Sequence, residues 1–495
     1  MNARSTDLAR LKERLPLLVF LFCVAQPLLD VLSYWQSYFA LPGLLISVPR
    51  ALLILSLLLA GYLCSRRRKL YWILGLGLLA YLAGHLAACS AYGAWDFIAD
   101  LTAQARILLI PMMTLAFLTI LRQNESCLQA MERGFAVNMA SFVLIAVLST
   151  VTGTDPHTYY EKEIGVLGWF VWGNSQSAIL SILTPIIIAW TQRRFEGRLL
   201  PTASVAVICF GLLYACATRL AYATLIASGL GLSVCLVITD RKKRSLALTI
   251  LLIAGIYAGF YPLSPTHANQ QAMKQTAQIK QQRIDAAVSE FVEPGTRRTE
   301  DSRALAAAYH YYLQGMVDRF GLERVAKAYD YSIDQKQIFD RRAKLLRFCG
   351  FLMEDAPAIS RVFGLPSSSM QQWTSRYSYY RDEWTDGPEL FDVENDLHGI
   401  YFQCGLAGLI PFLIFLLAFG VHALAAMLRR FRAVFSFEFC AFAGAYCYLL
   451  LYAYYTSSVV RWLNTSVYLA AILAGLWLLS SRRAEAPAEP REVRP

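Results

Sequence analysis

The chain has 495 residues, of which 56% are hydrophobic and only 16% are charged, and its formal net charge is +11. Soluble domains carry about 25% charged residues, so this composition excludes an ordinary soluble protein. The basic residues lie in short runs between apolar stretches. This placement predicts contact with anionic membrane lipid and gives no indication of nucleic-acid binding.

Apolar stretches of roughly 17–25 residues, the length that crosses a bilayer, recur along the chain. They predict an all-α, polytopic membrane protein with about twelve transmembrane helices, nine within residues 1–263 and three within residues 398–481. The centres of the stretches lie near Val19, Ile54, Gly77, Met113, Leu144, Leu183, Ile208, Ile226, Ile253, Pro411, Tyr448 and Ala471.

The basic residues predict the orientation. With the N-terminus inside, the inside segments hold 24 of the 46 Lys and Arg residues, the short outside loops hold 5, and residues 264–397 hold 17. The positive-inside rule applies to short loops and exempts long domains. We therefore expect both termini in the cytoplasm, residues 264–397 as one extracytoplasmic domain between the ninth and tenth spans, and residues 482–495 as a disordered cytoplasmic tail.

Residues 264–397 have the composition of a water-soluble, mainly helical domain. The polar stretch Asn269–Arg283 lacks proline, and Ser302–Phe320 and Ile333–Leu352 carry apolar residues at helical spacing. Five aromatic residues fall within Trp373–Trp384, interleaved with two arginines. These rings either stack on sugars or form the small core of the domain, or an aromatic belt at the headgroups.

Four arginines stand at the outer ends of apolar spans: Arg50, Arg106, Arg219 and Arg461. An arginine at this depth is costly and usually faces a cavity, a partner or a polar ligand. A guanidinium binds phosphate through two parallel hydrogen bonds, so four converging arginines predict a diphosphate site. The alternative for each is that it extends to the lipid headgroups.

Other polar residues carry weaker signals. Asp30 lies inside the first span and needs a partner, for which Arg50 is a candidate. Asp96 and Asp100 read as a solvated helix face. No cluster of histidines and cysteines has metal-ligand spacing, and no glycine-rich nucleotide loop is present. We therefore expect no metal site and no cofactor.

Three segments, in this order, resemble those of one family. They are Gly168-Trp-Phe-Val-Trp-Gly-Asn174 before an apolar helix, Ala217-Thr218-Arg219 opening a helix, and Glu394-Asn395-Asp396-Leu397-His398 followed by Gly405-Leu-Ala-Gly408. With about twelve spans and a large outer loop, the chain is similar to the superfamily of O-antigen ligases and Wzy-type polysaccharide polymerases.

The resemblance implies a glycosyltransferase in the bacterial cytoplasmic membrane. Its donor would be a polyprenyl-diphosphate-linked saccharide, its second substrate a saccharide acceptor, and the four arginines would hold the diphosphate. Metal-dependent lipid-linked glycosyltransferases of the same broad class typically carry an acidic motif in the first outside loop. This chain has no acidic residue there, so metal-independent chemistry is expected. A transporter or flippase of lipid-linked saccharide is the alternative from another class.

The closing motif departs from the ligase pattern. Ligases of the family carry His-Asn there, whereas this chain has Glu394-Asn395, with His398 four residues later. The departure favours a polymerase over a ligase. Glu394, Asp396 and His398 are the catalytic candidates, with Asn174 and Asn395 as further motif residues. The alternative for the two acidic residues is ordinary capping of the following helix.

Overall fold

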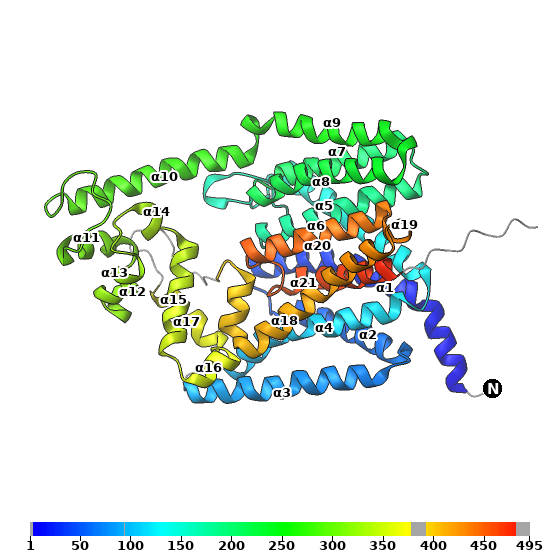
Figure 1. Ribbon diagram of the computed structural model, residues 1–495, viewed down its shortest axis with the longest axis horizontal. Coiled ribbons are helices and arrows are strands. Elements are labelled where there is room, and N and C mark those ends of the chain that lie inside the picture. The colour runs from blue at the N-terminus through cyan, green and yellow to red at the C-terminus, as the bar shows by residue number, and fades with distance from the viewer. Residues whose placement is uncertain (1–2, 94, 378–392, 482–495) are drawn as a thin grey trace, which may run out of the picture.

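A computed structural model describes residues 3–93, 95–377 and 393–481 (Figure 1). These residues are mainly helical, as the sequence predicts. Their β-structure consists of two isolated bridges and no strand. The helices of the bundle are α1 (Ala3–Tyr38), α2 (Leu44–Cys64), α3 (Arg68–Tyr92), α4 (Phe97–Leu121), α5 (Glu125–Val151), α6 (Gly173–Arg194), α7 (Leu199–Ala215), α8 (Arg219–Thr239), α9 (Arg244–Gly259), α18 (Asp396–Arg429), α20 (Phe437–Tyr455) and α21 (Leu463–Ser481).

Nine of these helices are long and apolar enough to cross a membrane, counted over the described residues. The other three are α6, α7 and α9. Helices α7 and α9 have only 17 and 16 residues, and α6 is rich in buried polar side chains such as Ser177, Ser181 and Thr184. A helix surrounded by protein needs less apolar surface than one that faces lipid. The polytopic class is thus confirmed, while the count of twelve spans stays a prediction.

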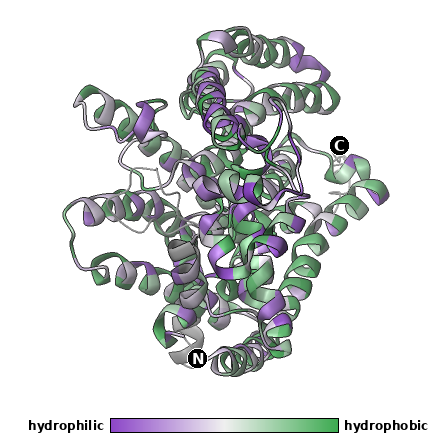
Figure 2. Ribbon diagram, turned by 90° about the vertical axis from the view of Figure 1, so that its left-hand side faces the viewer, coloured by the Kyte–Doolittle hydropathy of each residue, from purple (hydrophilic) through white to green (hydrophobic). Residues whose placement is uncertain are grey.

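The bundle has a protected centre and a lipid-like periphery. Helices α6 and α21 are largely buried and pack against α20 and α4, respectively. Helix α3 lies along one edge and α9 along the opposite edge (Figure 1). Seen from one end of the molecule, the peripheral helices are mainly hydrophobic (Figure 2). Exposed leucines along α2 and α3 fit this arrangement, because a membrane-facing surface has to be apolar.

A second group of helices lies beyond one end of the bundle, and we call it the end domain (Figure 1). It consists of α10 (Pro265–Val288), α11 (Ser302–Tyr312), α12 (Gln314–Phe320), α13 (Leu322–Ala328), α14 (Gln335–Ile338), α15 (Arg341–Asp355), α16 (Ala358–Phe363) and α17 (Ser367–Tyr377). Ile284, Leu305, Tyr309 and Phe348 form its own small core. The aspartate side chains at the N-caps of α11 and α15 accept hydrogen bonds from backbone amides in the first turn of each helix.

The aromatic stretch Trp373–Trp384 is only partly described. Trp373 is half-buried against the core of the end domain, and the Arg319 guanidinium lies 4.4 Å from its ring centre. Tyr379, Tyr380 and Trp384 lie outside the described residues. Packing therefore accounts for Trp373, while sugar binding by the other rings stays a prediction.

Helix α18 is kinked where it meets the end domain. Gly405 adopts φ +60°, and a Cβ atom there would lie 2.3 Å from the Val362 carbonyl oxygen, so only glycine fits this close approach of two backbones. The kink frees carbonyl groups within the bundle, and each finds a donor. The Leu365 amide donates to Phe402 O at 2.7 Å, and the Gln104 side chain donates to Gln403 O at 2.7 Å. The first glycine of the Gly-x-x-Gly motif thus joins the end domain to the bundle.

Candidate active site

A cavity of about 810 Å³ opens among α1, α2, α4, α6 and α21. Two of the four predicted arginines, Arg50 and Arg106, line it. Its polar lining includes Asp30 and Gln176, and its apolar lining includes Ile54, Leu58, Leu109 and Ile179. The cavity therefore combines cations with an apolar wall, as a ligand with an anionic head and a hydrocarbon tail requires.

Arg50 is held in place by Asp30. Its Nη2 donates to Asp30 Oδ1 at 2.7 Å, and both side chains are mostly buried. The sequence-based prediction of this pair is confirmed. The Arg50 Nε and the Gln176 Oε1 are buried atoms that have no hydrogen-bond partner among the described residues. Because such atoms are normally satisfied, a bound ligand or water that accepts from Arg50 and donates to Gln176 would complete the site.

Two tryptophans stand beside the second arginine. Arg106 lies 6.0 Å from the ring centre of Trp462, a cation–π contact. Trp172 lies 5.0 Å from Trp462, ring centre to ring centre, and is half exposed. The two rings are tilted by 46° to each other and lie next to a guanidinium, an arrangement that suits a sugar ring next to a phosphate.

Glu394 and Arg219 belong to a second cluster. Arg342, from the start of α15, forms an ion pair with the Glu394 carboxylate, which is 28% exposed. Tyr159 lies in the loop between α5 and α6. It is close enough to Arg219, Arg342 and Glu394 for their charges to change its pKa. Desolvation raises the pKa of Tyr159, and the two nearby guanidinium groups oppose that rise. The phenol therefore stays protonated and able to donate a hydrogen bond.

The loop between α5 and α6, residues 152–172, contributes to both regions. Tyr159 belongs to the second cluster, and Phe170, Val171 and Trp172 line the cavity. Lys162 in the same loop donates to Asn269 of α10 at 3.4 Å. It is thus tied to the end domain and is not a freely solvated side chain.

The closing motif is anchored from both sides. Asn395 is the N-cap of α18, where its side chain accepts from the His398 amide at 3.1 Å and donates to Tyr454 O at 2.8 Å. Asp396 is completely buried, and its carboxylate accepts from two backbone amides and from Arg461. His398 is exposed. Glu394 is thus the motif carboxylate left at the surface of the second cluster.

The structure brings together only some of the predicted residues. Arg461 points to Asp396 and the Val393 carbonyl oxygen and is not among the residues that line the cavity. Arg219 is exposed in the second cluster, where its Nη2 lies 3.9 Å from the sulfur of Met273. Asn174 is exposed on the first turn of α6. The four arginines therefore divide between the cavity, the second cluster and an internal ion pair, and binding of a diphosphate by any of them stays a prediction.

Sequence reasoning missed Gln176, Tyr159 and Arg342. Gln176 lies two residues after Asn174, so its proximity to that motif could have pointed to it. Arg342 is one of many charged residues of a soluble-looking segment, and nothing local marks it. Its pairing with Glu394 joins residues 52 positions apart.

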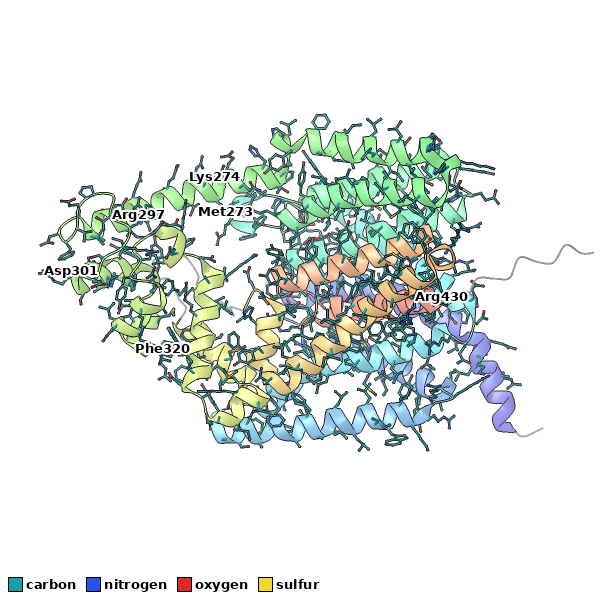
Figure 3. All side chains as sticks on the ribbon, in the orientation of Figure 1. Met273, Lys274, Arg297, Asp301, Phe320 and Arg430 are labelled. Carbon is teal, nitrogen blue, oxygen red and sulfur yellow. The ribbon has the colours of Figure 1, made fainter. Side chains whose placement is uncertain are left out.

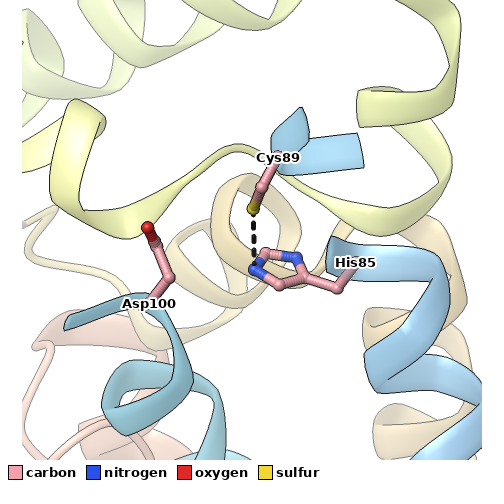
Figure 4. Close-up of side chains that lie close together, drawn as sticks. All are labelled: His85, Cys89 and Asp100. Atoms are coloured by element: carbon pink, nitrogen blue, oxygen red, sulfur yellow. Dashed lines mark hydrogen bonds between the residues drawn. The ribbon is translucent and has the colours of Figure 1, made fainter. Parts of the chain in front are cut away.

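A buried polar group lies outside the cavity, between α3 and α4 (Figure 4). It consists of His85, Cys89 and Asp100, all fully buried. The interpretation of Asp96 and Asp100 as a solvated face is wrong for Asp100, because Ser368 of the end domain covers it. Ser368 donates to the Asp100 carboxylate through its amide at 3.1 Å and its hydroxyl at 2.6 Å. Asp96 is the N-cap of α4.

An apolar helical bundle, an end domain and an arginine-lined cavity together define a polytopic integral membrane protein with a polar site between its helices. The sequence profile of the family described as O-antigen ligase like membrane protein matches residues 12–480, nearly the whole chain. The chain belongs to this family, as its motifs predicted. Membership indicates a glycosyl-transferring protein of polysaccharide biosynthesis, with a lipid-linked saccharide and an acceptor as its general partners. No curated protein shows a significant match to the chain.

Proposed function

We propose that the protein transfers or polymerises saccharide units from a polyprenyl-diphosphate-linked donor on the outer face of the bacterial cytoplasmic membrane. In this proposal the end domain is extracytoplasmic and both termini are cytoplasmic. Family membership supports glycosyl transfer in general. The observation that carries the finer proposal is the cavity with two arginines, an unsatisfied Arg50 Nε and an apolar wall.

In this proposal Arg50 and Arg106 hold the diphosphate, and the apolar wall receives the first part of the polyprenyl chain. Arg50 is oriented by Asp30, so its fork is fixed before the donor arrives. The apolar residues Ile54, Leu58 and Leu109 line the same cavity as the arginines. Trp172 and Trp462 then face the first sugar next to the phosphate.

The transfer forms one bond and breaks another. The acceptor hydroxyl oxygen attacks the anomeric carbon, and the bond from that carbon to the diphosphate oxygen breaks. The hydroxyl proton passes to the Glu394 carboxylate, which Arg342 orients. The negative charge that grows on the diphosphate is stabilised by the arginines. The donor is already activated, so the proposed step needs neither a metal nor a nucleotide.

A polymerase is favoured over a ligase. The position of the ligase histidine holds Glu394, and Tyr159, Arg219 and Arg342 surround it with hydrogen-bond donors that suit a saccharide acceptor. A polymerase needs an acceptor site for a growing chain of its own repeat unit. This cluster combines Tyr159 and Arg219 of the bundle with Arg342 of the end domain.

Reconstitution into liposomes with lipid-linked repeat units tests the proposal. A polymerase lengthens the lipid-linked chains when it receives repeat units alone, and the Glu394→Gln protein leaves them unchanged. A ligase consumes donor only after a separate acceptor is added, and that result would replace the polymerase by a ligase. A transporter changes the leaflet of the donor and leaves its glycan intact, and that result would overturn glycosyl transfer altogether.

A further inference from the structure

The buried carboxylate of Asp100 has no balancing cation among the residues that the structure describes. Asp100 is completely buried in the first turn of α4, and no described residue forms an ion pair with it. Its partners are the amide and hydroxyl of Ser368. Buried charges in proteins are normally paired or coordinate a metal, since an isolated ion in a low-dielectric interior is costly. The site therefore calls for a positive charge.

His85 and Cys89 lie beside Asp100 with the geometry of metal ligands. They are four residues apart on α3 and so share one face of the helix. One ligand atom from each of the three side chains lies within 4.8 Å of the others. The Cys89 Sγ is 3.3 Å from the His85 Nε2 (Figure 4). Tetrahedral zinc with bonds of about 2.0–2.3 Å places its ligand atoms roughly 3.3–3.8 Å apart, so a small adjustment is enough.

The surrounding contacts prepare the ligands. The His85 Nδ1 lies 2.7 Å from the Phe363 carbonyl oxygen, which can only accept, so Nδ1 carries the proton and Nε2 keeps its lone pair. The Asp100 oxygens each accept one hydrogen bond from Ser368 and keep further lone pairs. Histidine and carboxylate ligands of metals are typically oriented by such outer contacts.

We propose that His85 Nε2, Cys89 Sγ and the Asp100 carboxylate bind one Zn²⁺ ion. Binding releases the thiol proton of Cys89 to solvent. One thiolate, one carboxylate and a neutral imidazole then balance the two positive charges, which gives a neutral buried site. Nitrogen and sulfur donors favour zinc over magnesium or calcium. The hydrogen bonds of Cys89 and Gln104 to His85 Nε2 give way to the metal, and a water completes the tetrahedron.

The ion would fasten the end domain to the bundle. Its ligands come from α3 and α4, while the groups that orient them, Phe363 O and Ser368, belong to α16 and α17. The same segment meets the kink of α18 at Gly405. The proposal goes beyond glycosyl transfer, because the ion takes no part in the reaction. It differs from the sequence-based expectation that the chain has no metal site, which stays untested until the metal content is measured.

The test uses the full-length protein, purified in detergent without chelators and analysed for metal by mass spectrometry. We expect about one zinc per chain. Cys89→Ser and Asp100→Asn should lose it, whereas Cys349→Ser, which changes a buried cysteine of the end domain, should keep it. Wild-type protein without stoichiometric zinc, or a Cys89→Ser protein that retains it, would overturn the proposal.

A second measurement covers the case in which Cys89→Ser fails to fold. Wild-type protein depleted of zinc and loaded with Co²⁺ should show the intense near-ultraviolet absorption of a thiolate–cobalt bond, and its melting temperature should fall on depletion and recover with zinc. Absence of the cobalt band would show that hydrogen bonds alone hold the three side chains. Neither readout depends on glycosyl transfer, so the failure of one proposal leaves the other intact.

Discussion

Arg461 and Asp396 form an ion pair inside the protein, with the Arg461 Nε 3.3 Å from the Asp396 Oδ1 and side chains that are 4% and 0% exposed. The other carboxylate oxygen of Asp396 accepts from the amides of Val459 and Val460, both at 2.9 Å. A Cβ atom on Gly399 would lie 2.4 Å from the guanidinium carbon of Arg461, so this glycine leaves room for the pair. The pair joins the closing motif to the segment before α21, which leads into the cavity at Trp462.

The first prediction concerns this pair. Asp396→Asn leaves Arg461 buried without its counter-charge, and we expect a loss of about 3–5 kcal/mol in the free energy of unfolding. Thermal unfolding in detergent measures the loss, and Glu394→Gln, on the neighbouring exposed side of the motif, is the control with near wild-type stability. An Asp396→Asn protein that is fully stable but inactive would give Asp396 a direct role in the reaction.

The second prediction separates Glu394 from His398. Glu394→Gln keeps the shape of the side chain and removes the basic oxygen, so turnover should fall by about 10²–10⁴-fold while donor binding persists. His398 is exposed and contributes only its backbone amide to the cap, so His398→Ala should keep most of the activity. Steady-state kinetics with saturating donor decide between them. An inactive His398→Ala protein together with an active Glu394→Gln protein would reverse the assignment.

The third prediction concerns the two arginine environments. Arg50→Lys keeps the charge but loses the planar fork, so the KM for donor should rise by about tenfold or more. Arg219→Lys, in the second cluster, should instead lower turnover. Arg241→Lys is the matched control, because it makes the same exchange in the short segment between α8 and α9. If the Arg219→Lys protein turns over at the wild-type rate, Arg219 has no part in the site.

The fourth prediction follows from the raised pKa of Tyr159. Desolvation raises it above 10, the ordinary value, so the phenol is neutral in the folded protein over the range in which activity is measured. A group whose pKa is raised by folding contributes stability that is fully present below its unfolded-state pKa, here about 10. That contribution is lost as the pH rises through the folded-state pKa. Tyr159→Phe should therefore reduce the loss of stability above pH 10, as melting temperatures at increasing pH would show. An equal loss in both proteins would contradict the assignment.

Local sequence features predicted the helices and one ion pair but not the grouping of side chains from distant segments. The Asp30–Arg50 pair was predictable, because a buried carboxylate inside a span needs a partner on a neighbouring span. The cover of Asp100 was not, because Ser368 lies 268 residues away and belongs to a different helical unit. Arg461 resembled a ligand-binding arginine by its depth alone. Only the fold shows that Asp396 already binds it.

The last prediction concerns topology. The segments expected inside hold 24 Lys and Arg residues and the short outside loops hold 5. Among the described residues, the basic connections between α2 and α3 and between α8 and α9 lie at the end of the bundle away from the end domain (Figure 1). A cavity of about 750 Å³ there is lined by Lys12, Arg66, Arg67 and Arg122. Arg430, which follows α18 of the bundle, and Asp301, in the end domain, lie at opposite ends of the molecule (Figure 3). Both observations favour a cytoplasmic basic end and an extracytoplasmic end domain.

Cysteine labelling in intact cells tests this orientation. Glu300, in the end domain, and Lys242, between α8 and α9, are both exposed. In a Cys447→Ser background, which removes the exposed native thiol, Glu300→Cys should react with a membrane-impermeant maleimide and Lys242→Cys should react only after the cells are broken. If Glu300→Cys were protected in intact cells and Lys242→Cys were labelled there, the predicted orientation of the whole molecule would be reversed. The proposed donor would then have to be used on the cytoplasmic face.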